Sequence, residues 1–395
     1  MQCQRPWMQS TQINKLFAAL DNNTRFVGGC VRDALLGIDA EDIDMATPLL
    51  PEEVIKRLKA NNIKAIPTGL EHGTITAVIE GQPFEITTLR RDTSCDGRHA
   101  EVDFTDSWQQ DAARRDFTIN ALSCGLDGKI YDYFSGLDDL QNSEVKFVGN
   151  ADDRCREDYL RILRYFRFTA YYGKGKFNAD AINACKANAS GIKSLSGERI
   201  RQEMLKLLAS ENVILILDKM QEIGVSQKIF QGNINLDLAK NLRDLIKSGE
   251  ALILLASLLK NNISDLKSFT KLWKLSNKEA EFLKQILLTT FEPSPDSDIL
   301  EHKKLARKVG KRIYRGIMLL LAASDMQNSD KYLHRINEVE KWQIPFFPVN
   351  GKDLMNKGIN PGKEMGILLA KGESWWEDNN YAPSKRKVLD YIIRK

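Results

Sequence analysis

The stretch from Phe26 to Met45, which reads FVGGCVRDALLGIDAEDIDM, constrains the fold of this chain more than any other. A short extended segment leads into a pair of glycines, and a helical pattern then runs from Cys30 to Leu36 and stops at Gly37. The sequence DID that follows fits the start of a second strand. Strand, helix and strand in this order predict a small α/β unit.

The same stretch carries two features that suit phosphate chemistry. Gly28 and Gly29 let the backbone approach a phosphate closely, and the following helix offers its N-terminus to an anion. In a strand, Asp42 and Asp44 would point to one face, about 7 Å apart along the chain. Two such carboxylates can hold divalent cations, and metals about 3.5–4 Å apart stabilise both oxygens in phosphoryl transfer. Taken singly, the features also fit a plain turn and a solvated acid pair.

Together, GGxVRD and the DxD that closely follows resemble the head domain of the nucleotidyltransferase superfamily that contains class II tRNA CCA-adding enzymes and bacterial poly(A) polymerases. The resemblance implies an α/β head, a nucleotidyltransferase mixed sheet with helices, followed by an all-α neck, body and tail. It also implies that Gly28, Gly29 and Arg32 bind the triphosphate of the incoming nucleotide, and that Asp42 and Asp44 bind Mg²⁺.

Length and composition set further bounds. A chain of 395 residues exceeds one ordinary domain, and 43% hydrophobic residues suffice for a packed core. The net charge of +4 suits an RNA partner without requiring one. None of the six cysteines forms a CxxC pair, which favours reduced intracellular thiols. The N-terminus has no apolar signal core, and the most apolar run, Ala251–Ala256, is too short to span a bilayer. We therefore expect a cytoplasmic protein that does not bind or span a membrane.

Residues 1–147 are expected to form the catalytic head. Its other predicted elements are a helix over Gln12–Leu20, a helix from Pro51, a strand over Ile63–Ile66, and a hairpin of Thr74–Glu80 with Phe84–Leu89. Glu85 lies inside the last strand, where it could simply be an outward-facing glutamate without a functional role. In the family, the glutamate of a similar ExTT(F/L)R stretch joins the two aspartates, so the resemblance implies a third catalytic carboxylate.

The stretch from Arg90 to Phe104 is polar, charged and contains glycine, which predicts a loop. A disordered surface excursion is one reading. The resemblance implies instead the flexible loop that helps these enzymes change from adding C to adding A. The residues that match its core are Asp96, Gly97, Arg98 and His99. Related enzymes that add only CC lack this segment, so its presence favours complete CCA addition.

A second strong motif, DAARRDFTINAL, begins at Asp111. It matches the family signature RRDFTxNAL. Arg115 can supply a two-pronged fork to a phosphate. Asp116 can orient that fork or accept a sugar hydroxyl, and Asn120 can reach the ribose or the triphosphate. A bare Arg-Arg-Asp triplet is commonly a surface ion pair, but the FTINAL that follows favours triphosphate binding.

The neck is expected over residues 148–215. Within Val148–Phe168, an apolar stripe predicts a helix, and Glu157, Asp158 and Arg161 can converge on one face. An exposed salt-bridged helix is the plain interpretation. The sequence EDxxR followed by LRxxRF resembles the family's neck helix, in which the acid and the arginine read the incoming base. Arg164 would extend this base-recognition surface.

The rest of the chain has helical periodicity and no catalytic constellation. We expect a helical body over residues 216–330 and a helical tail over residues 331–395, both binding tRNA. The tail contains a stretch from Val349 to Gly366 that resembles the family's GxDLxxxGxxPGxxxG pattern. No obligate protein partner is indicated.

The predicted reaction joins CMP, CMP and then AMP to a tRNA 3′ end, from CTP and ATP, with release of pyrophosphate and without a nucleic-acid template. A poly(A) polymerase of the same superfamily is the nearest alternative. That group's basic RxF stretch is not seen before the hairpin, where this chain reads IPTGLEHGTI. A non-catalytic RNA-binding protein is the other alternative, and the intact DxD argues against it.

Overall fold

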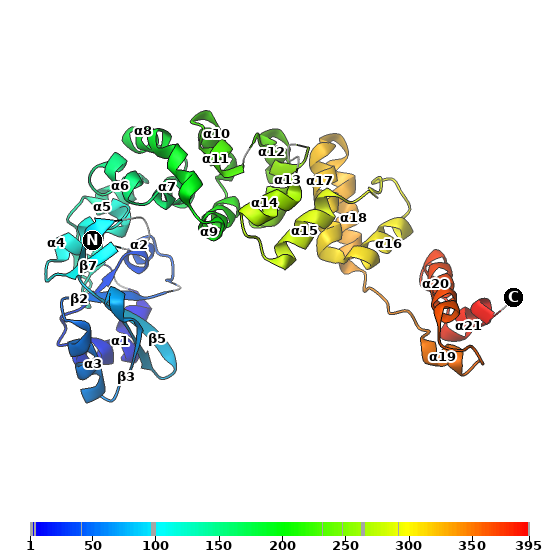
Figure 1. Cartoon of the computed structure of the whole chain (residues 1–395), viewed down its shortest axis with the longest axis horizontal. Coiled ribbons are helices and arrows are strands. Elements are labelled where there is room, and N and C mark those ends of the chain that lie inside the picture. The colour runs from blue at the N-terminus through cyan, green and yellow to red at the C-terminus, as the bar shows by residue number, and fades with distance from the viewer. Residues whose placement is uncertain are drawn as a thin grey trace. The chain divides into compact units, whose positions relative to one another are not determined.

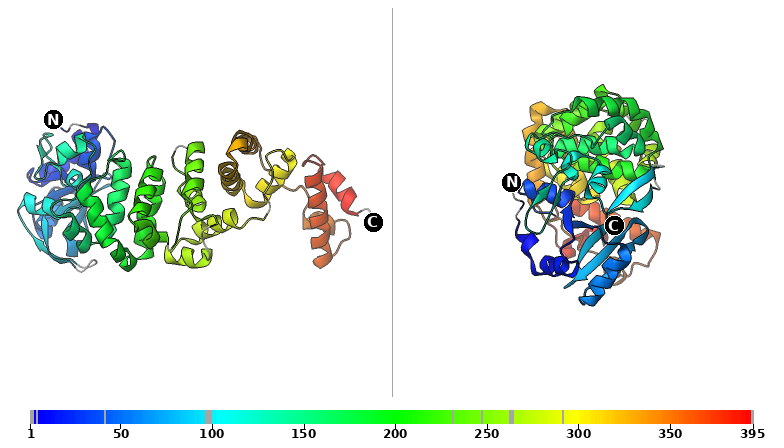
Figure 2. Two further views of the ribbon diagram at one scale, coloured as in Figure 1. Left: turned by 90° about the horizontal axis from the view of Figure 1, so that it is seen from above. Right: turned by 90° about the vertical axis from the view of Figure 1, so that its left-hand side faces the viewer.

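The computed structural model describes residues 3, 5–40, 42–95, 100–230, 232–246, 248–261, 265–290 and 292–393. It divides into two compact units, Met1–Asn233 with Lys271–Lys274, and Ile234–Thr270 with Leu275–Lys395. All described strands belong to the first unit, and the second is built from helices (Figures 1 and 2). Among the helices of the described ranges, none has the length and apolar character needed to cross a membrane.

A mixed sheet of seven strands, in the order β3-β4-β5-β2-β1-β8-β9, forms the centre of the head. Among the described strands, only β2 and β5 pair in parallel, which sets Asp44 opposite Glu85. The predicted α/β head with a mixed sheet is therefore confirmed. The strands are β1 Arg25–Val27, β2 Asp44–Thr47, β3 Lys64–Gly69, β4 Thr74–Ile79, β5 Gln82–Thr88, β8 Ser123–Cys124 and β9 Ile130–Tyr131.

Short helices surround this sheet, and local sequence explains where they begin. Ser10 accepts a hydrogen bond from the backbone N–H of Ile13 and so caps α1. Proline and two glutamates occupy the first turn of α3, as expected. The head helices are α1 Thr11–Ala19, α2 Gly29–Leu35, α3 Pro51–Ala60, α4 Trp108–Ala113 and α5 Gly136–Gln141, with 3-10 turns η1 Pro6–Gln9, η2 Leu70–His72 and η3 Thr118–Asn120.

The stretch expected to be a loop contains a two-stranded antiparallel sheet. Strand β6 is Arg90–Cys95 and β7 is Ala100–Phe104, with Arg90 opposite Phe104. The prediction of irregular backbone was wrong for these residues, because pairing the two arms gives their backbone polar groups partners that the polar composition does not reveal. Asp96, Gly97, Arg98 and His99 lie outside the described residues.

The helix expected across Val148–Phe168 is interrupted. Helix α6, Ala151–Glu157, ends where Asp158 takes an extended backbone with φ −155° and ψ 107°. The carboxylate of Asp158 then accepts from the N–H of Leu160, at the start of the next helix. The helices that complete the first unit are α7 Leu160–Tyr171, α8 Ala179–Asn188, α9 Gly197–Leu208, α10 Val213–Glu222 and α11 Val225–Phe230, with the 3-10 turn η4 Ala189–Ser194.

The remaining elements are helical, as predicted. They are α12 Leu236–Leu245, α13 Ala251–Leu259, α14 Leu266–Leu272, α15 Asn277–Leu287, α16 Ile299–Val309, α17 Lys311–Ser324, η5 Met326–Asn328, α18 Ser329–Lys341, α19 Gly351–Met355, α20 Lys363–Asp378 and α21 Lys385–Ile393. Leu354, Trp376 and Val388 centre a small apolar core of the last three helices. The division into head, neck, body and tail remains a prediction.

Candidate active site

The twin-glycine turn joins β1 to α2, and two arginines lie against it. Gly28 has a φ of +71°, which side-chain-bearing residues rarely adopt. A Cβ at Gly28 would stand 2.8 Å from Nη1 of Arg115, and one at Gly29 would stand 3.6 Å from Nη2 of Arg32. Glycine is therefore needed at the first position for both backbone geometry and space, and the turn carries positive charge from two sides.

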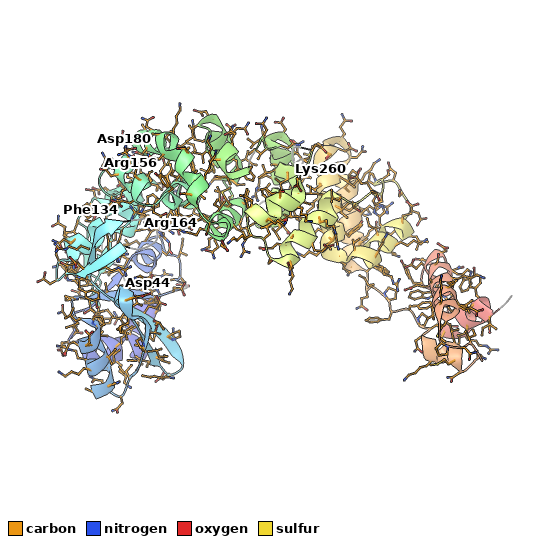
Figure 3. All side chains as sticks on the ribbon, viewed as in Figure 1. Asp44, Phe134, Arg156, Arg164, Asp180 and Lys260 are labelled. Atoms are coloured by element: carbon orange, nitrogen blue, oxygen red, sulfur yellow. The ribbon has the colours of Figure 1, made fainter. Side chains whose placement is uncertain are left out.

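The three predicted catalytic acids lie on or just before the interior strands β2 and β5. Asp44 begins β2, Asp42 precedes it by two residues, and Glu85 lies opposite Asp44 on β5. All three residues are exposed, and Figure 3 labels Asp44 on the strands of the head. Within the described residues, no three His, Cys, Asp or Glu side chains are placed to hold a metal ion by themselves.

The electrostatics of Asp44 suit a cation nonetheless. Loss of hydration raises the pKa of its carboxyl group, Arg115 acts in the opposite direction, and Asp42 raises the pKa further. Two acids that disfavour each other's charge, both open to solvent, form a pair of oxygen donors that a divalent cation would stabilise. The donor set therefore fits a metal held jointly by protein and substrate.

Cys30 contacts the backbone of Asp44, a role that the sequence analysis missed. Its thiol is buried and lies 3.3 Å from the carbonyl oxygen of Val27 and 3.5 Å from that of Asp44. Burial raises the pKa of Cys30 to about 12, so the thiol stays protonated and can donate to these carbonyls. The cysteine inside GGCVRD thus ties the start of α2 to the start of β2.

Arg115 is oriented by Asp111 and not by Asp116. Nη2 of Arg115 donates to Asp111 at 3.2 Å, and Nε of Arg114 donates to the other carboxylate oxygen at 2.9 Å. Burial raises the pKa of Asp111, but the two guanidinium charges lower it overall. Of the two roles predicted for Asp116, orienting the Arg115 fork belongs to Asp111, and accepting a sugar hydroxyl stays a prediction. The i, i+4 spacing of Asp111 and Arg115 was the sequence signal that could have identified the partner.

Asp116 instead joins the head to α7. It accepts hydrogen bonds from Asn120 at 3.0 Å and from Arg164 at 2.7 Å. Asn120 in turn accepts from Nη1 of Arg32 at 2.5 Å. Burial would raise the pKa of Asp116, but the charge of Arg164 and these hydrogen bonds lower it overall. Arg164, labelled in Figure 3, also lies 3.7 Å from Glu203 on α9. One polar chain therefore runs from the glycine turn into the helices.

The buried guanidinium of Arg32 has little freedom. It forms two hydrogen bonds of 2.9 Å with Asp33 and lies 4.1 Å from the ring centroid of Tyr172. The hydroxyl of Tyr172 donates to Asp33 at 3.1 Å. These contacts hold Arg32 against the turn before any ligand arrives.

The predicted base-recognition residues form two separate ion pairs. Arg161 pairs with Glu157, whereas Asp158 pairs with Arg199 of α9 at 2.6 Å. All four residues are partly exposed. Convergence of Glu157, Asp158 and Arg161 on one helix face was therefore wrong in detail, because α6 ends at Glu157 and turns the next carboxylate toward α9. The sequence analysis did not single out Arg199.

Comparisons with known proteins show which family the chain is similar to. The family described as the Poly A polymerase head domain matches residues 24–146, and the one described as a probable RNA and SrmB-binding site of polymerase A matches residues 176–233. The mitochondrial CCA tRNA nucleotidyltransferase 1 of Mus musculus is 36% identical, over 99% of this chain and 93% of its own length. The CCA-adding enzyme of Ligilactobacillus salivarius is 32% identical, over 88% and 86% respectively.

Solved structures agree as well. The Bacillus stearothermophilus CCA-adding enzyme in complex with CTP aligns with a TM-score of 0.74 and 25% identity, covering 98% of each chain. The Thermotoga maritima CCA-adding enzyme, complexed with tRNA, aligns with a TM-score of 0.71 at 20% identity, which shows a shared fold. On its identity to these relatives over nearly its whole length, the chain belongs to the family of class II CCA-adding tRNA nucleotidyltransferases.

Proposed function

We propose that this enzyme adds C, C and A in turn to the 3′ end of tRNA, from CTP and ATP, releasing pyrophosphate and using no template. One observation carries the proposal: two open carboxylates, Asp42 and Asp44, stand beside a glycine turn against which Arg32 and Arg115 lie. Opposite charges around one open space suit a triphosphate and a metal together. The named activity of the relatives supports the same reaction.

The chain's own residues would hold the triphosphate through the turn. Gly28 and Gly29 leave room for phosphate oxygens near the backbone, and Arg115 presents its fork from above Gly28. Arg32, fixed by Asp33 and Asn120, would supply a second charge from the other side. Asp116 would act through Asn120 and Arg164 by keeping these groups in position.

The family uses a divalent metal ion, and we infer Mg²⁺ for this chain. Mg²⁺ is commonly held by one or two carboxylates together with substrate phosphates and water, so Asp42 and Asp44 suffice as protein ligands. When bound, the ion would activate the terminal tRNA hydroxyl and neutralise charge on the triphosphate. Glu85, opposite Asp44, would orient the site or complete it.

Base choice would come from Asp158 and Arg161. Cytosine and adenine share an exocyclic amine beside a ring nitrogen acceptor. A carboxylate can accept from the amine, and a guanidinium can donate to the ring nitrogen. Both side chains have a partner already, but Asp158 retains acceptor capacity and Arg161 carries five N–H donors. Glu157 and Arg164 would then position the pair and its surroundings.

We further infer that the head is catalytic, that the neck reads the base, and that body and tail bind tRNA. The DGRH sequence favours complete CCA addition, as argued from the resemblance. Cytoplasmic localisation is proposed from the sequence, although the mouse relative is named as mitochondrial.

One assay separates the candidates. The purified chain is incubated with Mg²⁺, tRNA lacking CCA and each labelled nucleotide, singly and combined, and the products are resolved by length. A CCA-adding enzyme adds C from CTP alone and stops after one A when CTP and ATP are both present. A poly(A) polymerase would extend a long A tail, and a non-catalytic binder would leave the tRNA unchanged.

A further inference from the structure

The head contains a cavity of about 630 Å³ where β1 begins, at the opposite end of that strand from Gly28. The turn before β1, helix α1, the start of α4 and the β8–β9 turn contribute to it. Its volume is that of a small-molecule site. Most of its polar lining comes from carboxamides, a hydroxyl and one guanidinium: Gln9, Asn14, Asn22, Asn23, Thr24 and Arg25.

Arg25 is held flat between two aromatic rings in this lining. Its guanidinium carbon lies 4.0 Å from the ring centroid of Trp108 and 3.5 Å from that of Tyr131. Nη1 donates to the hydroxyl of Tyr133 at 3.3 Å. Among the described residues, no carboxylate stands within ion-pair distance of Arg25. A guanidinium fixed by stacking, with N–H groups left at its edge, is suited to a phosphate or carboxylate.

Thr24, beside Arg25 in the lining, carries a polar group without a partner among the described residues. The residue is 3% exposed, and its hydroxyl has no hydrogen-bond partner within the described part of the chain. Buried hydroxyls are nearly always paired, because an unpaired one loses its hydration without compensation. Asn14 also has capacity: its amide nitrogen donates to the carbonyls of Gln9 and Ser10, while its side-chain oxygen remains available.

The local charge permits an anion. Asp127 is the acid in the described lining, and it is exposed and accepts from the backbone N–H of Lys129 at 3.0 Å. The ammonium group of Lys129 lies 5.1 Å from the ring centroid of Tyr131. In the described lining the charges of Arg25 and Asp127 balance, and Lys129, outside the lining, adds a positive charge nearby.

We propose that this cavity binds a small phosphate monoester that carries hydroxyl groups, of the sugar-phosphate class. The phosphate would take the free edge of Arg25, and the hydroxyls would pair with the carboxamides. The facing sides of Trp108 and Tyr131 are already filled by Arg25, so stacking of a nucleobase between them is not part of the proposal. The site is additional to the proposed nucleotidyltransferase site.

The test titrates the full chain with ribose 5-phosphate, inorganic phosphate or ribose, and follows the indole N–H resonance of Trp108, assigned with a Trp108→Phe variant. Ribose 5-phosphate should shift this resonance saturably, with inorganic phosphate binding several-fold more weakly and ribose weaker still. Arg25→Met should weaken binding about tenfold or more, because a charge-assisted pair is lost. Lys129→Met is the control, because Lys129 also lies over the ring of Tyr131 but is outside the cavity lining. Its affinity for ribose 5-phosphate should stay within about twofold of the wild type.

Three results would overturn the proposal. One is the absence of a saturable shift up to about 10 mM, beyond the weak end of specific binding. Another is an unchanged affinity in both Arg25→Met and Arg25→Lys, the second variant keeping the stacked charge in case the first fails to fold. The third is loss of the shift in Arg115→Met but not in the Arg25 variants, which would place the anion in the active site alone. CCA addition itself should remain within about twofold in Arg25→Lys.

Discussion

Asp44 and Asp116 belong to the same head, yet their surroundings are opposite. Asp44 is exposed, and the structure shows no ion pair for it among the described residues; lost hydration and nearby Asp42 raise its pKa. Asp116 is enclosed by Arg164 at 2.7 Å and Asn120 at 3.0 Å, and its pKa is lowered despite burial. One carboxylate has acceptor capacity to spare, and the other has almost none.

This difference teaches how to separate ligand-binding groups from framework groups in one site. A carboxylate with unused lone pairs can take a metal or a substrate without breaking existing bonds. A carboxylate already bonded on both oxygens fixes the elements that it joins. Asp158 is intermediate, since it accepts from Arg199 and from the N–H of Leu160 yet stays partly exposed. The following predictions test this ranking.

The largest effect is expected from removing the open acids. Asp42→Ala and Asp44→Ala should each lower incorporation of both C and A by about a thousandfold or more, since several kcal/mol of charge stabilisation is lost and each 1.36 kcal/mol is tenfold in rate. Binding of tRNA should persist. Incorporation and tRNA binding are measured separately.

Asp39→Ala is the matched control for these variants. Asp39 is an exposed acid near the same segment, and its one ion-pair partner in the described part of the chain is Arg5 at 2.6 Å. Its loss should change turnover less than twofold, as expected for a surface pair. Near-normal turnover in Asp42→Ala or Asp44→Ala would remove the metal assignment and the comparison built on it.

The next largest effect is expected at the glycine turn around Gly28. Gly28→Ala should lower kcat/KM about 10- to 100-fold, because the new Cβ would displace Arg115 from its place over the turn. Gly37→Ala also puts a side chain at positive φ, +77°, but meets nothing within 4 Å. Both variants should lose about 1–3 kcal/mol of stability. Steady-state kinetics and chemical denaturation of the pair separate the two effects; equal losses of activity would show that backbone strain alone matters.

Much of the head followed from sequence because its signals are local. The strand, glycine turn and helix around Gly28 are specified by adjacent residues, and so is the hairpin around Gly81. The partners of charged groups were harder to predict. Arg199 lies 41 residues from Asp158, and Arg164 lies 48 residues from Asp116, so only the fold brings each pair together. The break at Asp158 was hidden because the flanking helical patterns join without proline or glycine.

A smaller, selective effect is expected at the intermediate acid. Asp158→Ala should reduce the preference for CTP over UTP and for ATP over GTP about tenfold while leaving catalysis, since a charged hydrogen bond to the base amine is lost. Arg161→Ala should lower the use of both CTP and ATP. Arg199→Ala should reduce the same preferences more weakly, because it frees Asp158 without removing it. The measurement is kcat/KM for all four nucleotides on tRNA ends matched to each step.

Arg156→Ala controls for loss of a neck cation. Arg156, labelled in Figure 3, is exposed and pairs with Asp152 on α6. It lies two residues from Asp158 in sequence, but Asp158 pairs with Arg199 instead. Its nucleotide preferences should match those of the wild type. Unchanged preferences in Asp158→Ala would mean that the two ion pairs are structural and that another surface reads the base.

The smallest effect on turnover is expected from the enclosed acid, where stability should change instead. Asp116→Asn removes the charge that Arg164 faces, and losing a charged hydrogen bond in this partly buried pair should cost about 1–3 kcal/mol of stability. The folded pKa of Asp116 lies below its unfolded value, so its contribution is complete above about pH 4 and disappears as pH falls through the folded pKa. The stability gap between wild type and Asp116→Asn should therefore be constant from pH 7 to about 5 and narrow below about pH 4. Urea denaturation at each pH measures this stability gap. Asp153→Asn is the control: Asp153 is an exposed acid 3.8 Å from Arg156, and its loss should cost about 1 kcal/mol of stability or less. A turnover loss as large as that of Asp44→Ala, without a change in stability, would place Asp116 among the ligand-binding acids and reverse the ranking.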